Sequence, residues 1–336
     1  MTQELKDYIW DYKDPYAWMG KVRSGMPPLM ITCAITGGGP GKEGHANLPE
    51  TPEEQALQTY EAYRAGACIV HVHGRDPNCN WKVSSKPEDY YKVNALIREK
   101  CPDIIINNTT GGGPGFTAKE RMASIYANPE MCSLNLGPLI IKAMLGERRE
   151  PIPHTRPALS VDVCASYTYG DITILAKAMK DQNIKPELEI THSGQYWVVQ
   201  DLISQGLLAP PFDFQFVMGQ QTGAYATPAN LLSLINELPQ ESLFTVIGVG
   251  QFQIPMNVMA ILLGGHVRVG LEDNIYYSRG RKFKNNAEAV DRIVRIAKEM
   301  NREIATPQQA RQMLGISPHS SRYEASGGSD LKIKRH

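Results

Sequence analysis

Two histidines lie two positions apart in the apolar stretch IVHVHGRD, residues 69–76. Alternate residues of a β-strand share a face, so a strand here places His71 and His73 side by side. Burying two neutral imidazoles is costly unless each has a partner, and the commonest partner of paired histidines is a metal ion. A pair of hydrogen-bonded core histidines is an equally good interpretation of this stretch alone, because a His-x-His spacing also arises by chance.

Carboxylates that could complete a metal site with the two histidines lie near the other end of the chain, in HVRVGLEDN at residues 266–274. Strand alternation puts Arg268 and Glu272 on one face, and Asp273 follows where the strand gives way to a loop. Two imidazoles and one carboxylate are a ligand set typical of catalytic zinc sites, which keep one position open for substrate. The alternative is a buried ion-pair cluster of Arg268, Glu272 and Asp273.

Hydroxyl and amide groups follow two further apolar runs. In NNTTGGGPG, Thr109 and Thr110 supply hydroxyl groups. The glycines from Gly111 onward expose N–H groups that can hold an anion, although a plain turn is the alternative. In MCSLNLG, Ser133 and Asn135 lie two positions apart and therefore project together.

A fifth run, ELEITHSG, carries Glu189, which is placed to orient a histidine or an arginine near a metal. His192 in the same segment is a weaker ligand candidate. A lone histidine near a strand end is more often solvated or hydrogen-bonded than a ligand.

Short β-branched runs alternate with longer helical patterns from residue 29 onward, and these elements must position the polar groups. A helix start is clearest at Thr51, where Pro52 takes the first helical position and Glu54 completes a capping box. Comparable helical patterns cover residues 86–100, 227–239 and 286–300. The strand candidates are residues 29–36, 68–75, 103–110, 131–137, 186–191, 212–219, 243–250 and 266–273.

Apolar strands in alternation with helices predict a parallel sheet covered by helices, and eight strands favour a closed (β/α)8 TIM barrel of the α/β class. The alternative is an open doubly wound sheet. TGGGPG at residues 36–41 is a weak match to its glycine fingerprint, because Pro40 and Pro49 delay the helix until Thr51. In a barrel the second and eighth strands flank the first, so we expect Glu272 to reach the two histidines at the C-terminal strand ends.

The chain divides into an N-terminal arm at residues 1–28, a barrel at residues 29–315 and a polar C-terminal tail at residues 316–336. Residues 138–170 are long and contain prolines, which predicts an insertion in the fourth unit. The arm is rich in Tyr and Trp, and these side chains need burial, either on the barrel or at a subunit contact.

The balance of 35 basic and 35 acidic residues gives a formal net charge of zero, so nothing favours nucleic acid or an anionic membrane as a partner. The six cysteines are scattered without a Cys-x-x-Cys pair, which is typical of a reduced intracellular protein. No apolar stretch approaches the ~20 residues that span a bilayer. We therefore expect a cytoplasmic protein.

Taken in order, these motifs resemble those of the β-keto acid cleavage enzymes. The resemblance runs from about residue 29 to about residue 315 and is carried by ITCAITG, NLPETPEEQA, AGACIVHVHGRDP, TTGGG, PEMCSLNLG, ELEITHSG, GGHVRVGLEDNIYY and ATPQQAR. It implies a (β/α)8 barrel, a homotetramer and one catalytic zinc ion. It also implies a reaction in which a β-keto acid and acetyl-CoA, as co-substrate, give acetoacetate and a new acyl-CoA.

The resemblance also implies roles for single residues. The metal ligands fall on His71, His73 and Glu272, and the general base falls on Asp273 with Arg268 as its partner. Further active-site positions fall on Thr109, Ser133 and Glu189, and substrate contacts are expected at Gly39, Thr110, Gly111 and Asn135.

One departure concerns the substrate. Family members that cleave a 5-amino substrate have a glutamate where this chain has Gly39, so we expect a different β-keto acid here. Lys42, Glu43 and His45 lie nearby and would restore polarity of either sign. The alternative functions are a zinc-dependent aldolase or retro-Claisen lyase that needs no CoA, and a non-catalytic barrel that binds a metal or another ligand.

Overall fold

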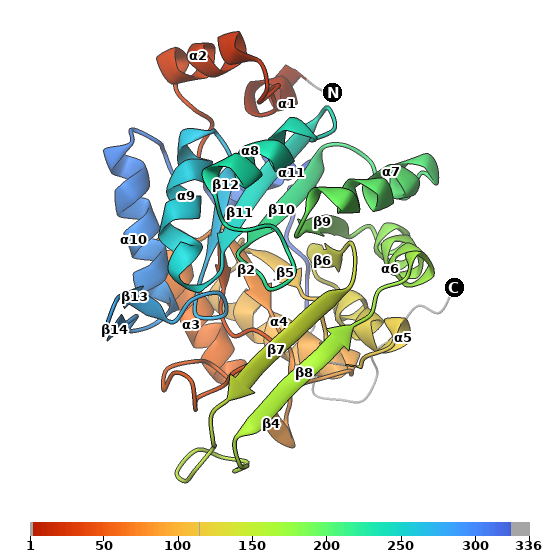
Figure 1. Ribbon diagram of the computed structural model, residues 1–336, viewed down its shortest axis with the longest axis vertical. Helices are drawn as coiled ribbons and strands as arrows, with labels where there is room; N and C mark the ends of the chain where they lie inside the picture. The colour runs from red at the N-terminus through yellow and green to blue at the C-terminus, as the bar shows by residue number, and fades with distance from the viewer. Residues whose placement is uncertain (1–2, 114, 324–336) are drawn as a thin grey trace.

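Eight parallel strands form a closed barrel in the order β1, β12, β11, β10, β9, β6, β5 and β2 (Figure 1). This is a computed structural model that describes residues 3–113 and 115–323. The barrel strands are β1 (Ile31–Ala34), β2 (Ile69–Val72), β5 (Ile105–Asn108), β6 (Met131–Asn135), β9 (Lys185–Ile190), β10 (Phe212–Met218), β11 (Ser242–Gly248) and β12 (His266–Val269). Each predicted strand overlaps one of them, which confirms the (β/α)8 barrel and excludes the open sheet.

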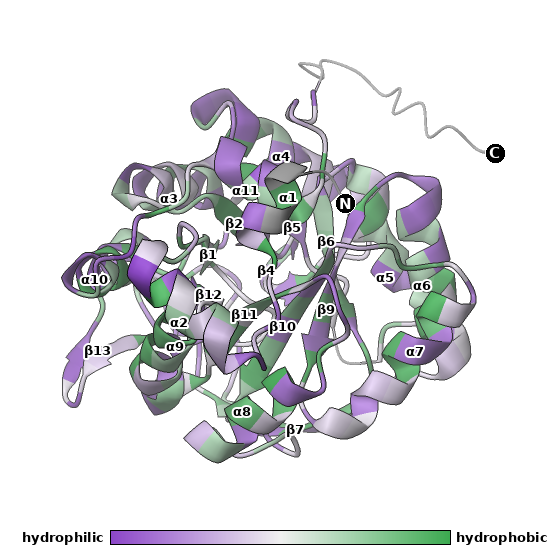
Figure 2. Cartoon of the chain, turned by 90° about the horizontal axis from the view of Figure 1, so that it is seen from above, coloured by the Kyte–Doolittle hydropathy of each residue, from purple (hydrophilic) through white to green (hydrophobic). Residues whose placement is uncertain are grey.

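Helices surround the strands, as the view along the barrel shows (Figure 2). The capping box predicted at Thr51 is present: its side chain accepts from the Glu54 N–H, and the Glu54 carboxylate accepts from the Thr51 N–H. The helices are α1 (Gln3–Tyr8), α2 (Pro15–Ser24), α3 (Pro52–Ala65), α4 (Pro87–Lys100), α5 (Ala118–Arg121), α6 (Tyr169–Asp181), α7 (Tyr196–Ser204), α8 (Pro228–Asn236), α9 (Gln253–Leu262), α10 (Asn286–Glu299) and α11 (Pro307–Leu314). Short 3-10 turns are η1 (Met122–Ala127), η2 (Ser193–Gln195) and η3 (Gly250–Phe252).

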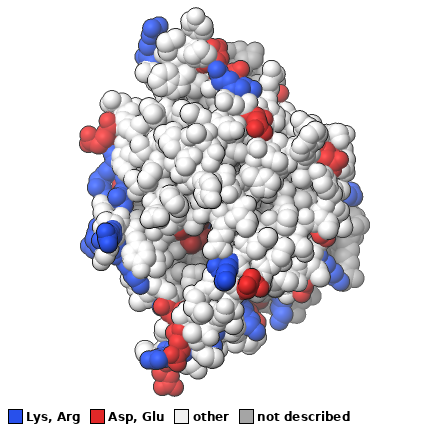
Figure 3. Space-filling view, in the orientation of Figure 1, with Lys and Arg blue, Asp and Glu red and all other residues white. Residues whose placement is uncertain are grey.

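The main core lies between the barrel and these helices. Residues such as Val70, Val72 and Ile106 are fully buried there. Strands covered on both faces must be apolar almost throughout, which explains why they were recognisable in the sequence. No helix among the described residues is long and apolar enough to cross a membrane. On the face seen in Figure 3, charged side chains of both signs are scattered, mostly toward the edge.

The N-terminal arm packs over one end of the barrel (Figures 1 and 2). The Tyr12 ring lies 4.8 Å from that of Phe244 and 4.6 Å from that of Trp10, whereas Tyr16 is 79 % exposed. The arm therefore buries part of its aromatic surface on its own barrel. The division into arm, barrel and tail stays a prediction, and residues 324–336 of the tail lie outside the described part.

The insertion predicted at residues 138–170 contains a long antiparallel hairpin that the sequence analysis missed. Its strands are β7 (Leu139–Leu145) and β8 (Leu159–Ala165), and no barrel strand pairs with them. The hairpin projects beyond the barrel at the end away from α1 and α2 (Figure 1). Smaller two-stranded sheets are β3 (Arg75–Asp76) with β4 (Cys79–Val83) and β13 (Tyr276–Ser278) with β14 (Arg281–Lys282).

A buried ion cluster anchors the loop of this hairpin to the segment between β1 and α3. Arg148 donates to both carboxylate oxygens of Glu50, at 2.7 and 2.9 Å, and to Glu43 at 2.6 Å. Arg156 donates to the other Glu43 oxygen at 2.8 Å. The side chain of Arg148 is fully buried and those of Glu43 and Glu50 are almost so, so these charges depend on one another.

Replacing Arg148 with leucine is expected to lower the free energy of unfolding by roughly 3 kcal/mol, because two buried carboxylates lose their main partner. Urea unfolding followed by circular dichroism measures this change. Arg149→Leu is the matched control, since the neighbouring Arg149 forms an exposed pair with Glu147 and its loss should leave stability unchanged. Equal stability of the two variants would show that the cluster does not hold the hairpin loop.

Candidate metal and active site

Three potential metal ligands meet at the C-terminal end of the barrel. His71 Nε2 lies 3.3 Å from His73 Nε2 and 3.8 Å from Glu272 Oε1. His73 Nε2 lies 3.2 Å from the same Glu272 oxygen. Among the described residues, this is the group of His, Cys, Asp and Glu side chains whose spacing suits a metal ion. The fold therefore brings together the set predicted from two distant motifs.

Glu272 reaches this position by a different route from the one predicted. Strand β12 ends at Val269, so strand alternation does not place Glu272 beside Arg268. Gly270 instead turns the chain with a φ of 139°, a value that L-residues rarely adopt. Gly37 leaves room for the carboxylate arm, because a Cβ there would lie 2.7 Å from Glu272 Cγ. His73 also lies one residue beyond its strand.

The donor atoms fit a divalent cation. Burial, and then the nearby Arg268 charge, hold the pKa of His71 well below its usual range, so its imidazole is neutral and can offer a lone pair. Burial alone would raise the pKa of Glu272, but Arg268 and the two histidines outweigh it and hold that pKa well below normal. Two imidazole nitrogens and an ionised carboxylate suit zinc.

Arg268 connects this group to further carboxylates. It donates to Asp273 through Nε at 3.0 Å and through Nη2 at 2.9 Å, and to Glu272 Oε1 at 2.5 Å. Its Nη1 lies 3.7 Å from Glu189 Oε1. Burial opposes the charge on Arg268, but Asp273 and Glu272 outweigh it and hold its pKa well above normal. The guanidinium is thus charged and fixed.

The carboxyl groups around Arg268 differ in their proton affinity. Burial raises the pKa of Glu189 to about 8, which Arg268 only partly offsets, so this group is mostly protonated at neutral pH. Burial raises the pKa of Asp273 to about 6, with Arg268 again opposing it. Asp273 is therefore mostly ionised at neutral pH, close to the point where a base both accepts and returns protons readily.

Gln215 is a site residue that the sequence analysis missed. Its Oε1 accepts from Arg268 Nη1 at 3.1 Å, and its Nε2 donates to the buried Glu187 at 2.6 Å. A glutamine inside FDFQFVM carries no motif, so only its position in β10 shows that it supports Arg268.

The other predicted site residues divide into two sets. Thr109, Gly111, Asn135, Glu189 and Gly39 line a cavity of about 650 Å³ above the histidines. Thr110 and Ser133 do not line it, because they bond to each other: the Thr110 hydroxyl donates to the Ser133 carbonyl at 2.6 Å, and the Ser133 hydroxyl accepts from the Thr110 N–H.

The structure also changes two expectations, one about anion binding by the glycines after Thr110 and one about polar residues near Gly39. The N–H of Gly111 donates to the Thr109 hydroxyl at 2.9 Å, so in this structure it does not point to an anion. The suggestion that Lys42, Glu43 or His45 restores polarity near Gly39 is wrong, because none of the three lines the cavity. Lys42 pairs with Glu54, Glu43 pairs with Arg148 and Arg156, and His45 contacts the Phe283 carbonyl.

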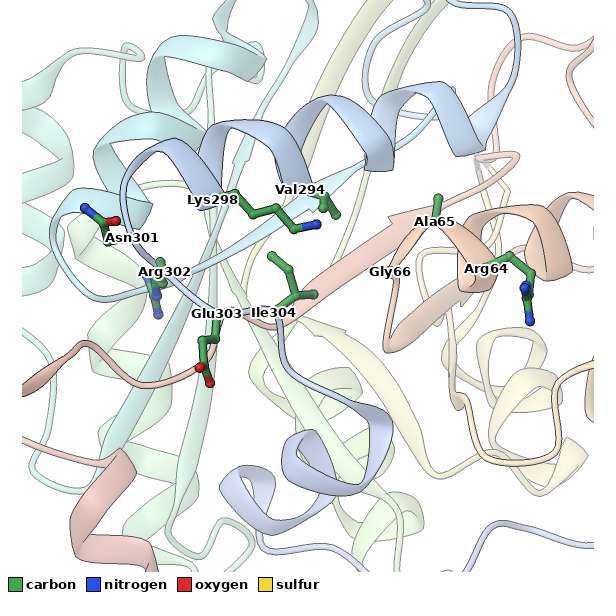
Figure 4. Close-up of a pocket in the computed structure, with 9 residues that line it drawn as sticks. All are labelled: Arg64, Ala65, Gly66, Val294, Lys298, Asn301, Arg302, Glu303 and Ile304. Carbon is green, nitrogen blue, oxygen red and sulfur yellow. The ribbon is translucent and has the colours of Figure 1, made fainter.

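A second hollow, of about 610 Å³, lies between the ends of α3 and α10 (Figure 4). Its lining includes Arg64, Val294, Lys298 and Ile304, with neither an imidazole nor a thiol among the described residues. Its described lining therefore holds no cluster of potential metal ligands, and the cavity over His71 is the candidate active site.

The chain matches known proteins over most of its length. The family model described as beta-keto acid cleavage enzyme matches residues 28–316. The 3-keto-5-aminohexanoate cleavage enzyme of Acetoanaerobium sticklandii is 39 % identical over 292 residues, which cover 87 % of this chain and 100 % of that protein. The 3-oxoadipate:acetyl-CoA acetyltransferase of Cupriavidus necator is 31 % identical, over 86 % of this chain and 95 % of that protein.

A solved structure supports the fold alone. The ternary complex of ObcA with a C4-CoA adduct and oxalate is similar with a TM-score of 0.64 at 19 % identity, over 80 % of this chain and 67 % of that one.

Substituting both histidines, as His71→Ala and His73→Ala together, is expected to abolish stoichiometric zinc binding, because one carboxylate cannot hold the ion alone. Elemental analysis of the dialysed protein measures bound zinc. His192→Ala is the control, since His192 is exposed and outside the ligand group, and it should keep the metal. Zinc retained by the double variant would place the metal elsewhere.

Proposed function

Since the chain belongs to the family of β-keto acid cleavage enzymes, we propose that it condenses a β-keto acid with acetyl-CoA and releases acetoacetate and a new acyl-CoA. One observation supports this most directly. A potential His2Glu metal set lies next to Asp273, a carboxylate that is not part of the set and is held by Arg268. A Lewis acid beside an unliganded base suits proton removal next to a carbonyl group.

In this proposal His71, His73 and Glu272 hold zinc, which when bound supplies a Lewis acid that makes the C2 proton of the keto acid acidic. Asp273 removes that proton. Arg268 fixes the carboxylate through two hydrogen bonds, so Asp273 needs no reorientation before it acts. Glu189 is mostly protonated at neutral pH and can donate a hydrogen bond to a carbonyl oxygen in the cavity.

The proposed reaction transfers the acyl group of the keto acid, from C3 outward, to CoA. The C2 carbanion attacks the thioester carbonyl of acetyl-CoA, a C–C bond forms and CoA leaves as the thiolate. The thiolate then attacks the original C3 carbonyl, and the bond between C2 and C3 breaks. The electron pair returns to C2, which takes back the proton from Asp273. The products are acetoacetate and the acyl-CoA of the original tail.

The relatives differ in the part of the keto acid beyond C3. The two relatives named above act, by their names, on an amino-substituted acid and on a dicarboxylic acid. Family membership therefore does not fix the tail. Gly39 lines the cavity, and a Cβ added to it would meet no atom within 4 Å. Because a glycine offers no carboxylate to an ammonium group, we propose a substrate other than the 5-amino acid.

Replacing Asp273 with asparagine should lower the rate of acetoacetate release by roughly 100-fold or more, because an amide cannot accept the C2 proton. Enzymatic assay of acetoacetate, run with and without acetyl-CoA over several β-keto acids, measures the rate. The control is Asp291→Asn, which alters an exposed residue of α10 and should leave the rate unchanged.

Unchanged turnover in Asp273→Asn, with zinc still bound, would remove Asp273 from the proposed role. Cleavage that proceeds without acetyl-CoA would favour the aldolase or lyase alternative.

A further inference from the structure

The hairpin of β7 and β8 has one face turned toward the cavity and one face, with both polar and apolar side chains, turned away from it. Its register pairs Ile141 with Val163, Ala143 with Val161 and Leu145 with Leu159, and all six side chains line the cavity. The opposite face pairs Lys142 with Asp162 and Met144 with Ser160, and these residues do not line it. Side chains alternate along a strand, so one apolar face of the hairpin is turned toward the candidate active site.

The barrel side of the cavity adds three apolar side chains above its floor. Val217 at the end of β10 and Ile247 at the end of β11 line it, as does Val249. Charged groups gather at the floor, beside the potential metal ligands. The cavity thus has a polar floor and an apolar hairpin wall, a form that suits a site which orients one end of a ligand and buries the other.

The carboxylates at this floor are already engaged. Those of Glu189, Glu272 and Asp273 line the cavity, and each lies within 3.7 Å of a nitrogen of Arg268. An ammonium group on a substrate would find no free counter-ion among these described lining residues. The other lining cation is Lys82, an exposed residue whose Nζ lies 5.1 Å from the ring of its neighbour Trp81.

From these observations we infer that the β-keto acid used by this protein carries an uncharged hydrocarbon tail beyond C3, which packs against the inner face of the hairpin. The inference rests on the proposed function, because it takes the keto and carboxylate groups to lie on the polar floor. From there the tail extends along Ile141, Ala143, Val161 and Val163. Burying a charged tail against these four side chains is unfavourable, since none of them replaces its water.

The first experiment compares 3-oxooctanoate, 3-oxoadipate and 5-amino-3-oxohexanoate at saturating acetyl-CoA. We expect a kcat/KM for the alkyl acid at least roughly tenfold above that for either charged acid. A charged acid that is used equally well or better overturns the inference and leaves the proposed function intact. Acetoacetate formation from none of them, or from any broader set of β-keto acids, contradicts the proposed function itself.

A pair of hairpin variants tests where the tail lies. Val161→Asp adds a charge to the inner face, and Ser160→Asp adds the same charge to the outer face of the same strand. Val161→Asp should lower kcat/KM for 3-oxooctanoate by at least roughly tenfold and reduce the preference for it over the 5-amino acid. Ser160→Asp should change neither. A rise in KM for acetyl-CoA alone, equal for every keto acid, would assign the face to the CoA arm and overturn the inference.

A second pair keeps the test decisive if Val161→Asp does not fold. Gly39→Glu adds a carboxylate at a position whose Cβ has open space, and Gly39→Gln is its neutral match. Gly39→Glu should shift the preference toward the 5-amino acid by roughly tenfold relative to Gly39→Gln, because it supplies the missing counter-ion. If Gly39→Glu does not shift the preference relative to Gly39→Gln, the tail does not lie in this part of the cavity and the inference is overturned.

Discussion

A single buried positive charge organises the candidate site. Arg268 is almost fully buried, and its guanidinium contacts Asp273 and Glu272 and lies close to Glu189. Carboxylates this close to one another cannot all be ionised in a buried site without a compensating cation. Burial raises the pKa of all three carboxyl groups and Arg268 opposes it to a different extent in each, so Glu272 is ionised, Asp273 is mostly ionised at neutral pH and Glu189 is mostly protonated. Three similar side chains around one arginine therefore take different chemical roles.

The support for Arg268 extends downward into the barrel. Gln215 in β10 accepts from Arg268 in β12 and donates to Glu187 in β9, so side-chain hydrogen bonds connect these three strands beneath the site, across the intervening β11. Burial raises the pKa of Glu187 to about 8, and a neutral carboxyl group is less costly to bury than an ionised one. The barrel interior thus contains a layer of hydrogen-bonded polar side chains below the floor, and this layer holds Arg268 in place.

The sequence predicted the barrel and the side-by-side placement of His71 and His73 because both depend on local signals. Continuous apolar strands, the capping box at Thr51 and the His-x-His spacing are visible without tertiary information. The misses depend on contacts between distant segments. Glu272 enters through a turn that needs Gly270 and Gly37, Gln215 is notable only for what surrounds it, and Thr110 and Ser133 face each other. The hairpin was missed for another reason. Its first strand, LIIKAML, is apolar on both faces apart from Lys142, so the sequence does not show which face meets the cavity.

The hairpin forms a two-stranded sheet of its own, whereas the floor of the site is built on strands whose register is fixed by the closed barrel. Its loop is anchored by Arg148, whose side chain pairs with Glu43 and Glu50 and does not line the cavity. Since no barrel strand pairs with the hairpin, we expect substitutions on its inner face to leave the register of the barrel strands unchanged. The residues that would select the substrate tail and the residues that would carry out the reaction therefore lie on separate structural elements. During evolution the inner face of the hairpin can change, and with it the preferred substrate, while the reacting groups on the barrel stay the same.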